Sequence, residues 1–217
     1  GLSASATGAS SDKVPTLPAG PNKTGADSNF DKQVLIGYFG RLSYDFKKKY
    51  LLMATFRVDG SSLFAQENRW GFFPGISGGW IMSDENFLQN SRVINYLKLR
   101  ASYGQTGNNS IGLYDALGRF ATDARYNGNA GILPNIMQNR RLTWETSTQL
   151  DAGFDLNIIK NRISISADYF NKTTEDLLFS MELPNTSGFN NVQTNVGKVR
   201  FHGYDLELSS RNIQTGG

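Results

Sequence analysis

The sequence contains no cysteine and only one histidine, His202, in 217 residues. The absence of cysteine excludes disulfide bonds and cysteine-ligated zinc. No second ligand stands at metal-binding spacing from His202, and the residues suggest neither a Ser-His-Asp nor a Cys-His arrangement for nucleophilic catalysis. We therefore expect no metal, no cofactor and no enzymatic activity.

Long apolar runs and a strong net charge are also missing. No stretch of 18 apolar residues occurs, which excludes a transmembrane helix. The 22 Lys and Arg residues nearly balance the 19 Asp and Glu residues, and the only basic run is the three lysines at positions 47–49. This charge gives no reason to expect a nucleic-acid partner.

The sequence does contain long alternations of apolar and polar side chains. In residues 50–59, Leu52 and Phe56 fall on one face of an extended chain, and Thr55 and Arg57 fall on the other. A period of two residues is typical of a β-strand with two different faces. The pattern predicts seven long strands, at about residues 33–46, 50–59, 72–83, 96–104, 146–158, 162–169 and 200–209.

The apolar faces of these strands need a cover, which is either a protein core or a lipid bilayer. Each face runs for roughly nine to eleven residues. Ten residues at a tilt of about 40° span about 25 Å, the height of the apolar band of an outer-membrane barrel. Strands of soluble sandwiches are usually shorter, at about 5–6 residues. Aromatic residues on the apolar faces fit either an interfacial girdle or a packed core: Tyr38, Tyr44, Tyr50, Trp80, Tyr103, Tyr169 and Tyr204.

The lengths of the connections support the bilayer. Tight turns lie at 47–49 and 160–161, and long segments without alternation lie at 105–145 and 176–198. Because antiparallel neighbours alternate direction, both tight turns fall on one rim and both long loops on the other. Short periplasmic turns and long extracellular loops are the rule for outer-membrane barrels.

These patterns predict the fold class and the organisation of the chain. The fold is all-β, an antiparallel meander of about seven long strands over residues 33–210 that spans a membrane as part of a β-barrel wall. Residues 1–32 are small, polar and rich in Gly, Ser and Pro, which predicts a loop or disordered lead-in, here an extracellular loop. Residues 211–217 form a polar tail.

Six segments resemble the SusC/RagA-type TonB-dependent outer-membrane transporters of Bacteroidota. In chain order they read KKKYLLMATFRVDGSSLFAQENRWGFFPGISGGWIMSDENF, YLKLRASYGQTGN, LTWETSTQLDAGFDL, RISISADYFNKTTEDLL, SGFNNVQTNVGKV and HGYDLELS. The resemblance covers residues 33–210. It implies that the meander is a segment of a large transmembrane β-barrel in the outer membrane, plugged and of about 22 strands. It also implies import of an oligosaccharide or peptide captured with a SusD-like surface lipoprotein, driven by TonB.

The chain departs from this family in size. Seven strands cannot close such a barrel, and we find no plug domain, no TonB box and no barrel-closing strand. We expect a fragment of the later part of the barrel that does not fold stably alone, because its two edge strands would be open. The alternatives are a passive porin or adhesin barrel and a soluble β-sandwich binding module that buries Leu150, Phe154 and Leu156.

Candidate binding residues come from the long loops. Aromatic rings there can stack on sugar rings or grip peptides, and the candidates are Tyr114, Phe120, Tyr126 and Phe189. The alternative role for these rings is packing within the loops or against the lipoprotein. Charged residues on the polar strand faces are expected to contact the lumen or plug: Arg57, Asp59, Arg100, Asp151, Asp155 and Asp168. A glycosidase pair among the carboxylates is conceivable, but a water-facing lumen explains them better.

Overall fold

The computed structural model describes residues 2–7, 22–28, 32–126 and 129–212. The chain divides into two units, Gly1–Gln33 and Val34–Gly217. In the first unit, β1 (Leu2–Thr7) and β2 (Asn22–Ser28) pair as an antiparallel hairpin. This segment therefore contains regular structure that its polar composition does not reveal. Its place in an extracellular loop remains a prediction.

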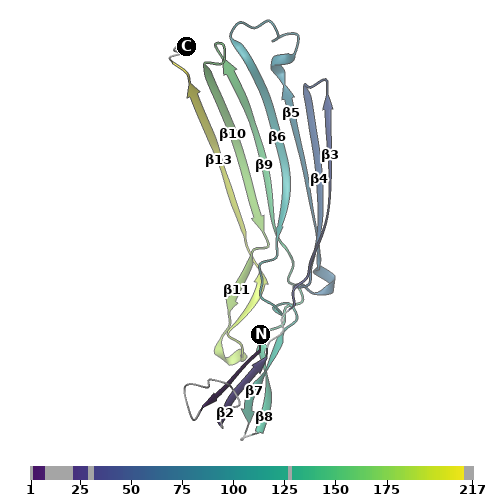
Figure 1. Cartoon of the computed structure of the whole chain (residues 1–217), viewed down its shortest axis with the longest axis vertical. Helices are drawn as coiled ribbons and strands as arrows, with labels where there is room; N and C mark the ends of the chain where they lie inside the picture. The colour runs from purple at the N-terminus through teal and green to yellow at the C-terminus, as the bar shows by residue number, and fades with distance from the viewer. Residues whose placement is uncertain (1, 8–21, 29–31, 127–128, 213–217) are drawn as a thin grey trace, which may run out of the picture. The chain divides into compact units, whose positions relative to one another are not determined.

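The second unit is built on one seven-stranded antiparallel sheet (Figure 1). Its strands are β3 (Leu35–Phe46), β4 (Tyr50–Ser61), β5 (Trp70–Ile81), β6 (Ile94–Asn108), β9 (Glu145–Ile158), β10 (Ile163–Glu175) and β13 (Lys198–Ser210). They stand side by side in that order, so the predicted meander is confirmed. The strands run for 12 to 15 residues. β5 equals its predicted length and β3 is two residues shorter, whereas the other five exceed the predicted lengths. The reason is that polar residues beyond the apolar stretches, such as Gln105, still pair with the neighbouring strand.

The long connections lie on one rim of this sheet and contain hairpins of their own. β7 (Arg119–Tyr126) pairs with β8 (Asn129–Ile136), and β11 (Leu178–Glu182) pairs with β12 (Asn191–Asn195). Figure 1 shows these hairpins at the lower rim and the short turns at the upper rim. The sequence predicted irregular loops here. Hairpin pairing supplies the backbone hydrogen bonds that an irregular segment would have to find elsewhere.

The helical segments of the described residues are short 3-10 turns: η2 (Gln66–Asn68), η3 (Met82–Asp84) and η4 (Asn185–Ser187). None of the helices among those residues has the length and apolar character needed to cross a membrane.

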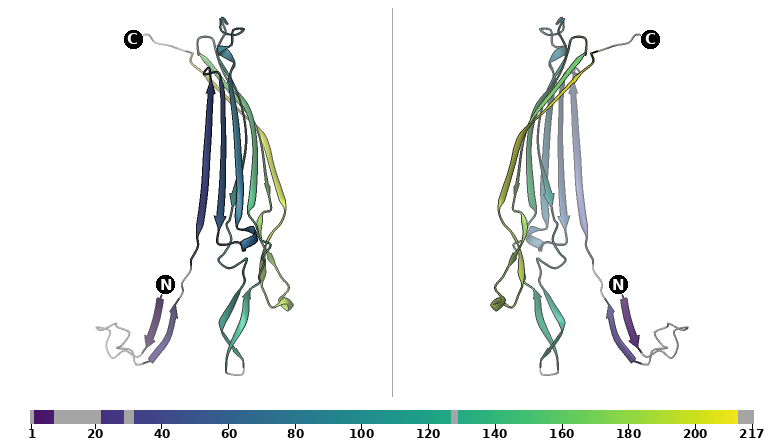
Figure 2. Two further views of the ribbon diagram at one scale, coloured as in Figure 1. Left: turned by 90° about the vertical axis from the view of Figure 1, so that its right-hand side faces the viewer. Right: turned by 90° about the vertical axis from the view of Figure 1, so that its left-hand side faces the viewer.

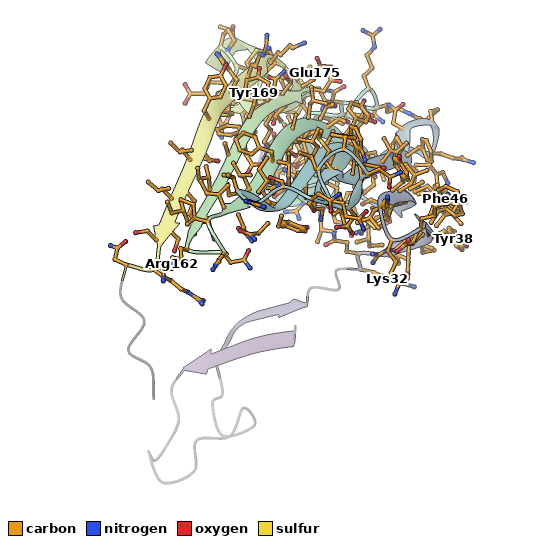
Figure 3. All side chains as sticks on the ribbon, turned by 90° about the horizontal axis from the view of Figure 1, so that it is seen from above. Lys32, Tyr38, Phe46, Arg162, Tyr169 and Glu175 are labelled. Atoms are coloured by element: carbon orange, nitrogen blue, oxygen red, sulfur yellow. The ribbon has the colours of Figure 1, made fainter. Side chains whose placement is uncertain are left out.

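The two faces of the sheet differ in the way the alternation predicts. Figure 2 shows the strands turned through a right angle, and Figure 3 looks along them at the side chains on both faces. Large apolar side chains on the predicted outward face are exposed, and Leu206 reaches 75%. Others on that face are Tyr38, Leu42, Tyr44, Leu52, Phe56, Phe72, Ile76, Leu150, Tyr204 and Leu208. This exposure contradicts the β-sandwich alternative, which would bury the face. Tyr169 and Tyr204 pair in the middle of their strands, away from the strand ends where a girdle is expected.

A small buried core lies at the rim of the long loops. We call it the rim cluster, and it consists of Phe64, Phe73, Ala116, Leu142 and Trp144. The Trp144 ring lies 5.3 Å from the Phe64 ring and 5.5 Å from the Phe73 ring, centroid to centroid, and its indole Nε1 donates to the Arg69 carbonyl at 3.1 Å. Phe64 precedes β5, Phe73 lies on β5, and the other three residues come from the connection between β6 and β9. The cluster therefore attaches these loops to the sheet.

The Phe73 ring needs the glycine at position 107. A Cβ at Gly107 would overlap the Phe73 ring, whereas a Cβ at Gly104, on the same strand, would meet nothing within 4 Å. In the complete barrel, Gly107→Ala is therefore expected to lower the free energy of unfolding by about 1–3 kcal/mol through overpacking. The matched Gly104→Ala variant should leave it within about 0.5 kcal/mol. Urea unfolding in lipid vesicles measures both. Equal stabilities of the two variants would contradict this account of the rim cluster.

Candidate functional site

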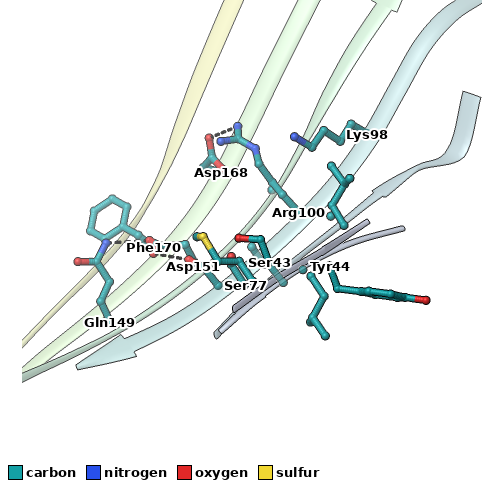
Figure 4. A pocket seen from close by; sticks show the side chains of 18 of the residues that line it. Ser43, Tyr44, Ser77, Lys98, Arg100, Gln149, Asp151, Asp168 and Phe170 are labelled. Carbon is teal, nitrogen blue, oxygen red and sulfur yellow. Dashed lines mark hydrogen bonds and ion pairs between the residues drawn. The ribbon is translucent and has the colours of Figure 1, made fainter. Parts of the chain in front are cut away.

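The polar face of the sheet carries an ion network that joins three strands. On β6, Arg100 Nη2 lies 2.7 Å from Asp168 Oδ2 on β10 and 3.1 Å from Asp155 Oδ1 on β9. Ser166 Oγ accepts from Arg100 at 2.9 Å and donates to Asp155 at 2.9 Å. We call these four residues the Arg100 network, and Figure 4 shows its link to Asp168.

Gly153 makes this network possible. In the register of the sheet, Gly153 on β9 stands opposite Arg100 on one side and opposite Asp168 on the other. A side chain at this position would overlap the Asp168 carboxylate. Arg100 and Asp168 can therefore meet across β9 because the residue between them has no side chain.

Further polar groups continue this face. Asp151 accepts from Ser102 Oγ at 3.2 Å and from Gln149 Nε2 at 2.9 Å. These residues, together with Arg100 and Asp168 of the network, border a hollow of about 750 Å³, part of which Figure 4 shows. The carboxylates are thus engaged by local partners, an arrangement that favours a water-facing wall over a glycosidase pair. In the described part of the chain, no three metal-ligating side chains come together.

A second ion pair lies closer to the rim of the long loops. Arg57 Nε donates to Asp59 Oδ1 at 2.8 Å, and the Asp59 residue is only 5% exposed. The two predicted lumen residues therefore contact each other. Phenylalanines interrupt the polar character of this face. Phe39 and Phe201 are exposed on the edge strands, and Phe170 borders the hollow.

Side-chain amides hold the long loops on the rim cluster. Asn195 Oδ1 accepts from the Thr143 backbone N–H at 2.9 Å, and Asn195 Nδ2 donates to the Thr143 carbonyl at 2.9 Å. This pair imitates the bonding between two strands. Asn139 Nδ2 also donates to the Gln193 carbonyl at 2.7 Å. The β11–β12 hairpin is thus attached to the segment that precedes β9.

Glu145 and Glu67 strengthen the same rim. Glu145 accepts from the Leu178 backbone N–H at 3.0 Å and from Asn108 Nδ2 at 3.3 Å. Glu67 Oε1 lies 2.8 Å from Arg140 Nη2. The pKa of Glu67 is lowered, first by a hydrogen bond from its own backbone N–H and then by the Arg140 charge. The Glu67 carboxylate therefore remains ionised near neutral pH. Both Glu67 and Glu145 act as acceptors that hold the loops.

The aromatic residues that the sequence proposed for ligand binding lie on three different parts of the long connections. Tyr114 is half-buried in a turn, with φ +73°, and its carbonyl accepts from the Leu117 N–H at 3.0 Å. Phe120 is 65% exposed on β7. The backbone of Tyr126 pairs at the end of β7, but its side chain lies outside the described residues. Phe189 is half-buried in the loop between β11 and β12, where its backbone bonds with Ser187.

Sequence reasoning missed the residues that position these loops. Asn139, Asn195 and Trp144 occur in segments without any alternation, so no periodic signal marks them. The one available hint was Trp144 directly before β9, since a large ring in a polar segment requires a buried contact.

The Arg100 network predicts a measurable coupling between strands. Arg100→Gln should lower the free energy of unfolding of the complete barrel by about 1 kcal/mol, because the three side chains remain partly exposed to water. A double-mutant cycle with Asp168→Asn in lipid vesicles should give a coupling of about 0.5–1 kcal/mol. Lys98→Gln, on the same strand and face, serves as the control. Strictly additive effects of Arg100→Gln and Asp168→Asn would contradict the network.

Comparison with known proteins agrees with this arrangement. The chain matches the family described as TonB dependent receptor-like, beta-barrel, over residues 4–216. It is 39% identical over 193 residues to TonB-dependent receptor P39 of Formosa agariphila, covering 89% of this chain and 18% of that receptor. It is 35% identical over 196 residues to TonB-dependent receptor SusC of Bacteroides thetaiotaomicron, covering 85% of this chain and 19% of SusC. The chain therefore spans about a fifth of the length of these relatives.

Solved structures show the same barrel. The RagAB peptide importer in its closed-closed state superposes with a TM-score of 0.83 at 30% identity, covering 99% of this chain and 24% of that chain. The siderophore receptor PirA from Pseudomonas aeruginosa gives a TM-score of 0.54 at 14% identity, covering 80% of this chain and 30% of that chain, which shows the fold alone. TonB-dependent receptor barrels sit in the bacterial outer membrane, and these receptors are transporters and not enzymes. By its family match and its seven-stranded sheet, the chain belongs to the TonB-dependent receptor-like β-barrel family, as part of a barrel of the SusC/RagA type.

Proposed function

We propose that this chain forms seven strands of the barrel wall of an active transporter in the outer membrane. The transporter imports oligosaccharides or peptides together with a SusD-like surface lipoprotein and draws energy from TonB. The observation that carries this proposal is the two-sidedness of the sheet. One face exposes a continuous set of apolar side chains, and the other carries the Arg100 network and Asp151.

The two-sidedness fits a wall between lipid and an aqueous pathway. Outer-membrane barrels alternate apolar side chains toward lipid with polar ones toward the lumen. Arg100 and its carboxylate partners would be very costly in lipid but are solvated in a lumen. The edge strands β3 and β13 have one neighbour each in the sheet, so further barrel strands would pair with their free edges.

The rim of long loops supports a role in substrate capture. The β7–β8 and β11–β12 hairpins stand on this rim, and the rim cluster and the Asn195 bonds hold the second hairpin in place. Loops fixed in this way present a defined surface to a lipoprotein and a ligand. RagAB, a peptide importer, supports a peptide as substrate, and the exposed rings on the loops suit sugars as well.

Dependence on TonB distinguishes this proposal from a passive porin. Uptake of labelled oligopeptides and oligosaccharides is measured in cells that express the full-length transporter, with and without TonB. We expect uptake of one of these classes to fall to background when TonB is deleted, because the barrel is plugged at rest. Uptake that persists without TonB and rises linearly with concentration would select the porin instead.

The loop aromatics can be tested individually. Phe120→Ala and Phe189→Ala are expected to weaken binding of the transported ligand by about 3- to 10-fold, through loss of ring stacking. Leu117→Ala removes an exposed aliphatic side chain from the same long loop and is the control. Binding is followed by isothermal titration with purified full-length protein. Unchanged affinity in both phenylalanine variants would assign these rings to loop packing.

A further inference from the structure

A groove with a floor of small residues crosses the outward face of the sheet near the short turns. Gly78, Ala101 and Ala152 are direct cross-strand neighbours on β5, β6 and β9, and all three are exposed. In the adjacent row toward the short turns, Trp80 pairs with Leu99, so bulky side chains border the small ones. The hollow measures about 870 Å³, within the range of about 300–1,000 Å³ typical of ligand sites. We call it the outer groove, and its outward-facing lining consists of Tyr44, Phe46, Tyr50, Leu52, Gly78, Trp80, Leu99, Ala101 and Ala152.

Aromatic rings form one wall of the outer groove. Tyr44 and Phe46 stack with centroids 6.5 Å apart, and Phe46 lies 6.2 Å from Tyr50. Tyr50 then stacks on Trp80 at 6.2 Å with an interplanar angle of 13°. Tyr and Trp rings favour the headgroup level of a membrane, where one end is apolar and the other wet. This wall therefore marks the depth at which a lipid headgroup meets its acyl chains.

Two lysines stand at the end of the groove that leads to the short turns. Lys47 Nζ lies 5.2 Å from the centroid of the Phe46 ring, which belongs to the groove wall, and Lys48 is the next residue. Both are exposed, and in the described part of the chain neither forms an ion pair. Lys49 is different, because its Nζ lies 3.3 Å from Glu85 Oε2.

Glu85 does not neutralise the other two lysines. Its Oε1 accepts from Tyr50 OH at 2.7 Å and from Trp80 Nε1 at 3.3 Å. The pKa of Glu85 is lowered by these hydrogen bonds, first that from Tyr50 and then that from Trp80, and further by Lys49. The carboxylate is thus ionised near neutral pH and occupied by the aromatic wall and Lys49. The nearby Asp45 carboxylate accepts from the Lys48 backbone N–H at 2.7 Å, so the ammonium groups of Lys47 and Lys48 remain open to another anion.

We propose that the outer groove binds one anionic phospholipid of the periplasmic leaflet. An acyl chain lies over Gly78, Ala101 and Ala152, and the phosphate meets Lys47 and Lys48. The proposal rests on the orientation under Proposed function, in which the short turns are periplasmic. A phospholipid matches both the apolar floor of the groove and the lysines at its end. The floor can contact an acyl chain, and the ammonium groups can bind the phosphate.

Fluorescence quenching by brominated phospholipids tests the site in the full-length protein. The Trp80 signal is obtained as the difference between the protein and its Trp80→Phe variant. Leu206→Trp places a reference ring in the same cross-strand row, outside the groove. Brominated phosphatidylglycerol is diluted in phosphatidylcholine. We expect it to quench Trp80 at a mole fraction at least about fivefold lower than the mole fraction needed to quench the reference ring. Brominated phosphatidylcholine should quench both rings equally.

Substitutions test the two halves of the site. Lys47→Gln and Lys48→Gln should each reduce the preference for phosphatidylglycerol by about fivefold, whereas Lys160→Gln in the other tight turn should not. Ala101→Leu with Ala152→Leu fills the groove and should abolish retention of phospholipid in native mass spectrometry. Ala167→Leu, outward on β10 but outside the groove, is the matched control.

The outcomes separate this site from the transporter proposal. Equal quenching of Trp80 and the reference by phosphatidylglycerol overturns the lipid site. The lipid site is also overturned if no brominated lipid quenches Trp80 while the reference ring is quenched. In that case a second copy or another protein covers the groove. Retention of lipid by the Ala101→Leu, Ala152→Leu variant also overturns the lipid site. A Leu206→Trp reference that no brominated lipid quenches counts instead against the membrane orientation itself.

Discussion

The structure depends on one constraint, which is that a strand in a bilayer must bond its backbone to neighbouring strands. No water is available in the hydrocarbon to take an unpaired N–H or C=O, so every strand needs a partner on each side. The seven long strands bond the backbone N–H and C=O groups of their neighbours, and each strand is 12 to 15 residues long. Within this sheet, β3 and β13 are the strands with a free edge, and the proposed barrel would pair these edges with further strands. The alternation of side chains then assigns one face to lipid and the other to water.

Glycines decide where side chains can cross from one strand to another. Gly153 leaves room for Asp168 to reach Arg100 over an intervening strand, so three strands share one ion network on the polar face. Gly107 makes room for the Phe73 ring, which anchors the rim cluster. On the outward face, Gly78 has the opposite effect, because its missing side chain leaves a hollow that no described side chain fills. The same residue type thus permits a contact on one face and leaves a vacancy on the other.

The loops are more ordered than their composition suggests because they form small sheets and share a core. Trp144 contacts Phe64 and Phe73, and Asn195 imitates a strand partner for Thr143. These contacts join segments more than fifty residues apart in the chain. In the proposed transporter, loops held by such contacts would lose less conformational entropy when they bind a ligand.

The sequence by itself determined the seven strands, their order, the lipid-directed face and the rim that carries the long loops. Each of these follows from a local period of two residues and from the lengths of the connections. The tertiary structure decided the rest. The Arg100 network and the outer groove depend on the register between strands, which alternation along a single strand does not specify. The hairpins β1–β2, β7–β8 and β11–β12 and the rim cluster arise in segments without a period, where pairing depends on contacts between distant residues. For the same reason, Tyr114, Phe120, Tyr126 and Phe189 could be proposed from the sequence as candidate binding residues, but the elements on which they lie could not.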